Sequence, residues 1–138
     1  MNSYGLRLGS LQHLGNSMPR YALLRHTGAP DDPSGCHFDL LLEDGARASC
    51  RTWRLADIPI VNAVEQDAIP LPAHRLIWLE PRSAAVSGGR GWAERIRAGR
   101  YQGSLPTVAN EPIEITFIDG DLSGKLTIVQ GRCRLSKP

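Results

Sequence analysis

Residues 36–45 read Cys-His-Phe-Asp-Leu-Leu-Leu-Glu-Asp-Gly, and this stretch decides the fold. Successive side chains of an extended strand point to opposite faces, so one face here is apolar and the other carries His37 and Asp39, two residues apart. The apolar face holds Phe38, Leu40 and Leu42. The closing Asp-Gly pair is a strong signal for a hairpin turn. The stretch therefore predicts a strand that begins an antiparallel hairpin.

The rest of the chain continues this pattern of short apolar runs between turn residues. Strands are expected at residues 21–26, 37–43, 47–55, 74–79, 113–118, 122–129 and 132–137. Residues 92–97 fit either a short helix or a strand. The frequent Gly and Pro residues, 14 and 10 in number, favour short strands over long helices. We expect an all-β, mainly antiparallel fold, a small closed or partly closed β-barrel of about seven to eight strands with little helix.

The bulk composition limits the class of protein. A chain of 138 residues with 41% hydrophobic and 22% charged residues is expected to form one globular domain rather than a disordered chain. Residues 1–17, which include His13, are interpreted as a flexible N-terminal arm before a domain at residues 18–138. Three Cys without a C-x-x-C pair suggest a reducing cytoplasm, and no run of residues is long enough to span a membrane.

A metal site is the first candidate for function. His26 lies on the strand expected before the His37–Asp39 pair, so all three side chains can converge. Imidazole and carboxylate groups are suitable ligands for Zn²⁺ or Mn²⁺. We interpret His26, His37 and Asp39 as a metal triad. The alternative is a solvated polar strand face, because the His-x-Asp spacing alone is not specific.

Positive charge gathers in the second half of the chain. Residues 75–138 carry ten Lys or Arg and six acidic residues, although the net charge of the whole chain is only +2. The segment from residue 82 to residue 100 predicts a salt-dependent contact with a nucleic-acid backbone, or else a solvated surface loop. Its basic residues are Arg82, Arg90, Arg95, Arg97 and Arg100. The glycine-rich residues 87–91 lack the Gly-Lys-Ser/Thr ending of a nucleotide-binding loop, and we expect them to form a corner with positive φ angles.

Several other polar residues have two readings. His74 begins an expected strand, where it is either a surface group or an acid that works near neutral pH. Asp31 and Asp32 lie in a turn-rich loop and either bind their own backbone or serve as outer partners of the metal ligands. Cys36 is expected to point away from the face that carries His37, which favours a structural role.

Several motifs occur in an order that resembles a known family. Residues 19–26 read Pro-Arg-Tyr-Ala-Leu-Leu-Arg-His, residues 37–43 read His-Phe-Asp-Leu-Leu-Leu-Glu, and residues 51–55 read Arg-Thr-Trp-Arg-Leu. Later segments agree in order at residues 71–76, 86–91, 99–101, 120–126 and 134–137. Together they resemble the 3'-phosphoesterase domain of the bacterial repair ligase called ligase D, and more closely its small stand-alone relatives. The resemblance spans residues 18–138.

The resemblance implies a β-barrel that holds one ion, Mn²⁺ or another divalent ion such as Zn²⁺. It assigns the metal to His26, His37 and Asp39. The implied activity is removal of a 3'-phosphate or a 3'-ribonucleotide from a primer-template during DNA end repair by non-homologous end joining. The implied partners are DNA 3' ends and DNA repair ligase or polymerase proteins, and we expect a cytoplasmic monomer with no membrane contact.

The sequence departs from the family at the groups that hold the phosphate. The family uses an Arg two residues after the Asp, followed by a downstream His and Tyr. Leu41 stands at the first position, and residues 78–86 contain neither His nor Tyr. Arg54 and Arg82 are the candidates to replace them, acting with His37 as the catalytic set. The sequence therefore leaves three functions open: a Mn-dependent 3'-phosphoesterase, a barrel that binds nucleic-acid ends or a repair partner without turnover, and an enzyme for a small phosphoester unrelated to nucleic acid.

Overall fold

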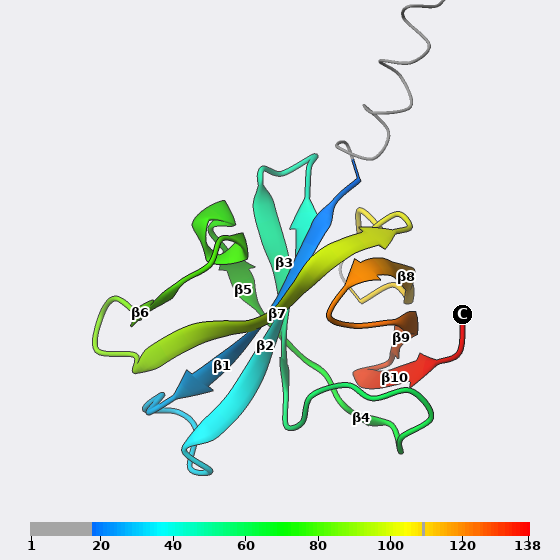
Figure 1. Cartoon of the computed structure of the whole chain (residues 1–138). Coiled ribbons are helices and arrows are strands. Elements are labelled where there is room, and N and C mark those ends of the chain that lie inside the picture. Colours follow the sequence, from blue (N-terminus) through cyan, green and yellow to red (C-terminus); the bar gives the residue numbers. More distant parts are fainter. Residues whose placement is uncertain (1–17, 109) are drawn as a thin grey trace, which may run out of the picture.

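The computed structural model describes residues 18–108 and 110–138, so the arm expected at residues 1–17, with His13, lies outside the described residues. One antiparallel sheet of ten strands contains every strand, and the only helix in the described part is a 3-10 helix of four residues (Figure 1). The elements are β1 (Arg20–Thr27), β2 (Cys36–Asp44), β3 (Ser49–Leu55), β4 (Gln66–Asp67), β5 (Ile69–His74), η1 (Leu76–Leu79), β6 (Ser83–Ala85), β7 (Trp92–Gln102), β8 (Ile113–Gly120), β9 (Gly124–Val129) and β10 (Arg132–Ser136). The all-β fold is confirmed.

The sheet curls into a barrel that is not fully closed. Its strand order is β4-β10-β9-β8-β7-β1-β2-β3-β5, with β6 added beside β7. The two edge strands, β4 and β5, are consecutive in the chain and are separated only by Ala68. The Ala68 amide donates to the carbonyl oxygen of Gly131 at 2.8 Å. Within the described residues no hydrogen-bonded ladder joins β4 to β5. The two edges of the sheet are connected there only by the covalent chain through Ala68.

Two separate apolar cores bury both faces of β1 and β2. The main core fills the inside of the barrel, because its members come from strands all around the sheet; Leu23 and Leu40 are fully buried in it. The second core lies on the outer face and consists of Ala22, Leu24, Leu41, Cys50, Trp78, Leu79 and Ala93. The segment from η1 to β6 covers this outer face (Figure 1). The alternation predicted for residues 37–43 is confirmed, since Leu40 and Leu41 belong to different cores.

The strand predicted at residues 74–79 is wrong. The strand lies earlier, at β5, and residues 76–79 form η1 instead. Pro70 and Pro72 hid this strand, and they are tolerated because β5 pairs on one side only, with β3. The apolar run after β5 then turns Trp78 and Leu79 into the second core, where they are 7% and 2% exposed.

Other differences from the expected elements are small. The number of strands exceeds seven to eight because β4 and β6 have only two and three residues, too few to show a periodic pattern. Residues 92–97, which fitted a helix or a strand, belong to β7. None of the helical structure in the described residues is long and apolar enough to cross a membrane.

Replacing Leu23 with Ala should lower the free energy of unfolding by about 2–5 kcal/mol, because the fully buried side chain would leave a cavity in the main core. Ile118→Ala is the control, since Ile118 is 40% exposed and its removal should cost much less. Urea unfolding followed by circular dichroism measures both values. Equal losses in the two variants would contradict the burial of Leu23.

Candidate metal centre

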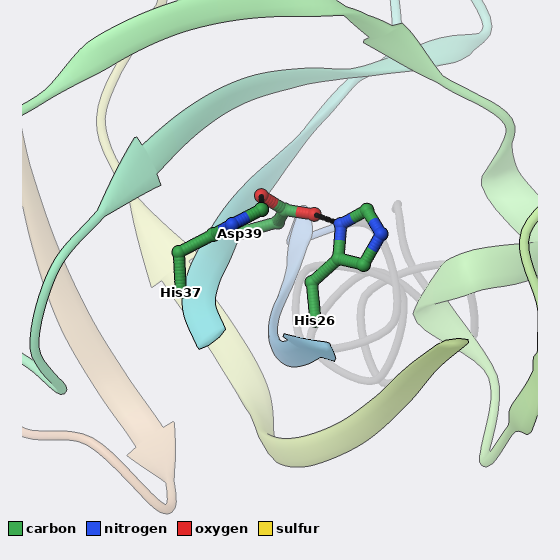
Figure 2. A group of neighbouring side chains, drawn as sticks. All are labelled: His26, His37 and Asp39. Carbon is green, nitrogen blue, oxygen red and sulfur yellow. Dashed lines mark hydrogen bonds and ion pairs between the residues drawn. The ribbon is translucent and has the colours of Figure 1, made fainter. Parts of the chain in front are cut away.

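Three potential metal ligands meet on the outer face of β1 and β2. His26, near the end of β1, lies directly opposite His37 of β2, and Asp39 follows two residues later on the same face. Their residues are 8%, 3% and 1% exposed. One ligand atom from each lies within 4.8 Å of the others. Figure 2 shows the Asp39 carboxylate between the two imidazole rings. The structure therefore brings together the three residues that the sequence proposed as a metal triad.

Each oxygen of Asp39 faces a different imidazole. Oδ2 lies 3.1 Å from Nδ1 of His26, and Oδ1 lies 3.1 Å from Nε2 of His37. Ligands that share one ion at about 2.0–2.2 Å lie roughly 3.0–3.5 Å from one another. The two distances from Asp39 to the imidazoles fall in this range.

The outer nitrogen of each imidazole is bound to a group that can only accept a hydrogen bond. Nε2 of His26 lies 2.7 Å from the carbonyl oxygen of Arg90, and Nδ1 of His37 lies 2.7 Å from Oδ2 of Asp32. Both outer nitrogens must therefore carry a proton. In a neutral imidazole the other nitrogen then holds a lone pair, so both rings direct a lone pair at Asp39.

The lone pair of an imidazole nitrogen and the oxygen of an ionised carboxylate repel each other. Their close approach is therefore stable only when a positive charge lies between them. Nε2 of His37 and Oδ1 of Asp39 are both buried and have no hydrogen-bond partner among the described residues. Either the imidazoles take up further protons or a cation lies among the three groups. The buried arrangement of two nitrogens and one carboxylate fits Mn²⁺ or Zn²⁺.

Both carboxylates near the imidazoles are ionised at neutral pH. Burial raises the pKa of Asp39, but its interactions with His74, His37 and His26 outweigh this effect and leave the pKa below its usual value. Hydrogen bonds from the side chains of Ser34 and then His37 lower the pKa of Asp32 to about 2. Asp32 thus remains an acceptor for the Nδ1 proton of His37.

Two loops place the outer partners. In the β1–β2 loop, Asp32 accepts hydrogen bonds from the backbone and the hydroxyl of Ser34 as well as from His37, so it shapes the turn and also orients a candidate metal ligand. In the β6–β7 loop, Gly91 has a φ of 89°, and a Cβ there would lie 2.1 Å from the carbonyl oxygen of Thr27. This close approach allows the Arg90 carbonyl to reach His26. The positive φ expected for the glycine-rich residues is confirmed at Gly88, Gly89 and Gly91.

A cavity of about 720 Å³ opens beside the candidate metal centre. His26 and Asp39 line it, while His37 lies behind them and is not part of the lining. His74 also lines the cavity, with its Nε2 3.8 Å from Oδ2 of Asp39, a distance for a charge interaction rather than a hydrogen bond. The Nδ1 of His74 donates to the carbonyl oxygen of Pro72 at 3.2 Å, which leaves Nε2 directed at the site.

Arg54 and Arg82 line the same cavity. The Nη2 of Arg54 lies 3.2 and 3.3 Å from the two carboxylate oxygens of Asp31. The guanidinium of Arg82 lies over the Trp78 ring, 4.7 Å from its centre. The Nε atoms of both Arg residues are buried without a hydrogen-bond partner in the described part of the chain. Both residues line the cavity that an anionic ligand would occupy.

The remaining Arg residues proposed for nucleic-acid binding divide into two groups. Arg90 lines the cavity, whereas the other three lie on β7 outside its lining. Arg95 donates to the carbonyl oxygen of Leu79 at 2.8 Å, Arg97 to that of Ile96 at 2.9 Å, and Arg100 to that of Met18. Leu41 does not line the cavity either, because it is fully buried in the second core.

Sequence reasoning undervalued two residues of this cavity. His74 was left open between a surface group and an acid, and Arg75 was not considered, yet both line the cavity. Their only signal was the position at the start of an apolar run, which does not show that the chain folds back over β1 and β2.

No family model matches the chain, and no curated protein matches it. The resemblance to the ligase D phosphoesterases therefore stays a prediction.

Replacing Asp32 with Ala should weaken the binding of Mn²⁺ or Zn²⁺ by roughly 10–100-fold, because Nδ1 of His37 would lose the acceptor that fixes its proton. Isothermal titration calorimetry measures the affinity. Asp57→Ala is the matched control, since Asp57 is exposed and lies outside the lining of this cavity. An unchanged affinity in a folded Asp32→Ala protein would contradict the assigned role of Asp32.

Proposed function

We propose that this protein is a metal-dependent phosphoesterase that removes a 3'-phosphate or a 3'-ribonucleotide from DNA ends during end repair. One observation carries the proposal: the buried group of two imidazoles and a carboxylate lies beside the cavity that Arg54 and Arg82 also line. A metal ion and a pair of guanidinium groups are together suited to bind and polarise a phosphate group.

The metal half of the site is formed by β1 and β2. A bound Mn²⁺ would neutralise phosphate charge and lower the pKa of a bound water. His26, His37 and Asp39 supply the ligand atoms, and His37 contributes to catalysis only in this way because it does not line the cavity. Asp32 and the Arg90 carbonyl keep each imidazole in the form whose lone pair faces inward.

The phosphate half of the site comes from other elements. Arg54 of β3 and Arg82, just before β6, donate to the phosphate oxygens in place of the family's Arg. Stacking of Arg82 on Trp78 holds the guanidinium plane while its N–H edge stays available. His74 holds its Nε2 beside Asp39, and because Nδ1 donates to the carbonyl oxygen of Pro72, Nε2 of the neutral ring carries a lone pair that can accept a proton from the attacking water.

The proposed substrates are DNA 3' ends and primer-templates, and the proposed cofactor is Mn²⁺. Repair ligases or polymerases would use the ends that the protein trims. These partners follow from the resemblance to the ligase D phosphoesterases, and the site supports them only through side chains of the kind that bind a phosphate group. A cytoplasmic location belongs to the same proposal.

A second candidate function is a barrel that binds nucleic-acid ends without turnover. The observation that favours it is Leu41, which stands where the family has its phosphate-binding Arg and is fully buried in the second core. A protein of this kind would bind DNA in a salt-dependent manner and would release no phosphate.

On a labelled primer-template with a 3'-phosphate, the protein should release phosphate with Mn²⁺ and not with EDTA. His37→Ala should lower the rate by about 100-fold or more, because it removes a ligand of the ion that activates the reaction. Cys36→Ser is the matched control, as its side chain points away from this face of β2. Phosphate release by His37→Ala at the control rate would rule out this site. No release by the wild-type protein would favour the second candidate function, a barrel that binds nucleic-acid ends without turnover.

Replacing Asp31 with Asn should strengthen the binding of inorganic phosphate by about two- to five-fold. The reason is that Asp31 competes for Nη2 of Arg54, and an exposed ion pair contributes at most about 1 kcal/mol. Phosphate titrations by calorimetry compare this variant with Asp57→Asn. Weaker phosphate binding in Asp31→Asn would show that Asp31 positions Arg54 rather than competing for it.

A further inference from the structure

A cavity of about 520 Å³ lies where the barrel fails to close, and we call it the seam cavity. Part of its lining comes from β3 and β5, and part comes from β8, β9 and the β9–β10 turn, which lie toward the opposite edge of the sheet. Ala68 and Gly131, whose hydrogen bond joins these two sides, are both in the lining. Among the described strands no ladder crosses the gap, so the hollow opens between the two sides.

The floor of the seam cavity belongs to the main core. Trp53, Ile113 and Ile128 line it and are only 5%, 4% and 6% exposed. Pro70 and Leu71 add apolar surface from β5. An apolar molecule that enters would exchange water for these side chains, which is favourable. The volume lies in the range of roughly 300–1,000 Å³ that is typical of small-molecule sites.

Hydrogen bonds hold the two sides of the seam cavity at a fixed separation. The Nη2 of Arg51 donates to the carbonyl oxygen of Pro106 at 2.6 Å, and the Nη2 of Arg47 donates to that of Thr107 at 3.0 Å. Both bonds join the β2–β3 hairpin to the β7–β8 loop. Together with the hydrogen bond of the Ala68 amide, they connect parts of the lining that no ladder joins. The hollow is therefore preformed, as small-molecule sites usually are.

The charges around the seam cavity cancel. Asp44 lies 3.5 Å from Nη2 of Arg51 and 3.8 Å from Nε of Arg47, and Glu111 is the other acidic residue of the lining. Two Arg and two acidic residues give a net charge of zero. Four Arg and two Asp line the cavity beside the metal centre, which gives +2 with the His residues neutral. A phosphate or other anion is thus drawn to the metal centre, while the seam cavity suits an uncharged molecule.

We propose that the seam cavity is a second binding site, which takes a small uncharged molecule with an apolar ring system and a neutral polar group. Trp53 and the other core side chains contact the ring system, since an aromatic wall favours a ring as its partner. The polar group faces the neutral hydrogen-bonding side chains of the lining, which are Ser49, Asn110 and Gln130. The site goes beyond the proposed function and needs no metal ion.

The test uses the full chain and two fluorescent probes with the same ring system. N-phenyl-1-naphthylamine is uncharged, and 1-anilinonaphthalene-8-sulfonate adds one negative charge. The uncharged probe should gain fluorescence on binding, equally with Mn²⁺ and with EDTA. Ser49→Trp should abolish this gain because the new ring blocks the half-buried mouth of the cavity, and Thr107→Trp tests the same mouth from an exposed position.

Two matched variants place a Trp at the other cavities. Ala85→Trp alters the lining of the cavity beside the metal centre, and Ala63→Trp alters that of a third cavity of about 630 Å³. Both residues are exposed, as Thr107 is, and both variants should keep the fluorescence gain of the uncharged probe. Circular dichroism establishes that each variant is folded.

A loss in either folded seam variant, with the gain kept in both matched variants, would support the second site. No gain with the wild-type protein, or an unchanged gain in both seam variants, would overturn it. A loss in Ala85→Trp or Ala63→Trp alone would move the probe to another cavity and overturn it as well. Tighter seam-dependent binding of the sulfonate would overturn the uncharged class of ligand. Phosphate release from 3'-phosphate DNA judges the proposed function separately.

Discussion

The burial of β1 and β2 on both faces is the constraint on which the candidate site depends. The main core covers one face, and the second core with the segment from η1 to β6 covers the other, so His26, His37 and Asp39 are withdrawn from water. Ionised and polar groups in such a place cost free energy unless they are paired. The chain meets part of this cost by giving each imidazole an outer acceptor, and the proposed cation would pair the inner atoms.

The sequence was informative where apolar and polar side chains alternate regularly along a strand. The alternation in residues 36–45 placed His37 and Asp39 on one face, and the hairpin pattern brought β1 beside β2, with His26 opposite His37. It was uninformative for the segment from β4 to β6, where strands of two or three residues and two Pro residues leave no period. That segment carries His74, Arg75 and Arg82, so half of the cavity depends on long-range packing that no local pattern records.

Charge density along the chain and charge density in space also differ. Five Arg between residues 82 and 100 suggested one basic track, but a long strand through this segment places three of them outside the cavity. Arg54 and Arg75, which are distant in sequence, take their place. A local charge of +2 thus arises in a protein whose whole net charge is also only +2, because acidic residues are concentrated elsewhere.

The break in the barrel at Ala68 has a consequence for its motions. Strands β1, β2 and β7 are each held by ladders on both sides, but β4 and β5 each pair with one neighbour, and the Ala68–Gly131 hydrogen bond links this part of the chain to the β9–β10 turn. Opening along this seam therefore breaks fewer ladder hydrogen bonds than opening between β1 and β2. The barrel can widen there while the ladder between β1 and β2, which positions the two imidazoles, stays intact.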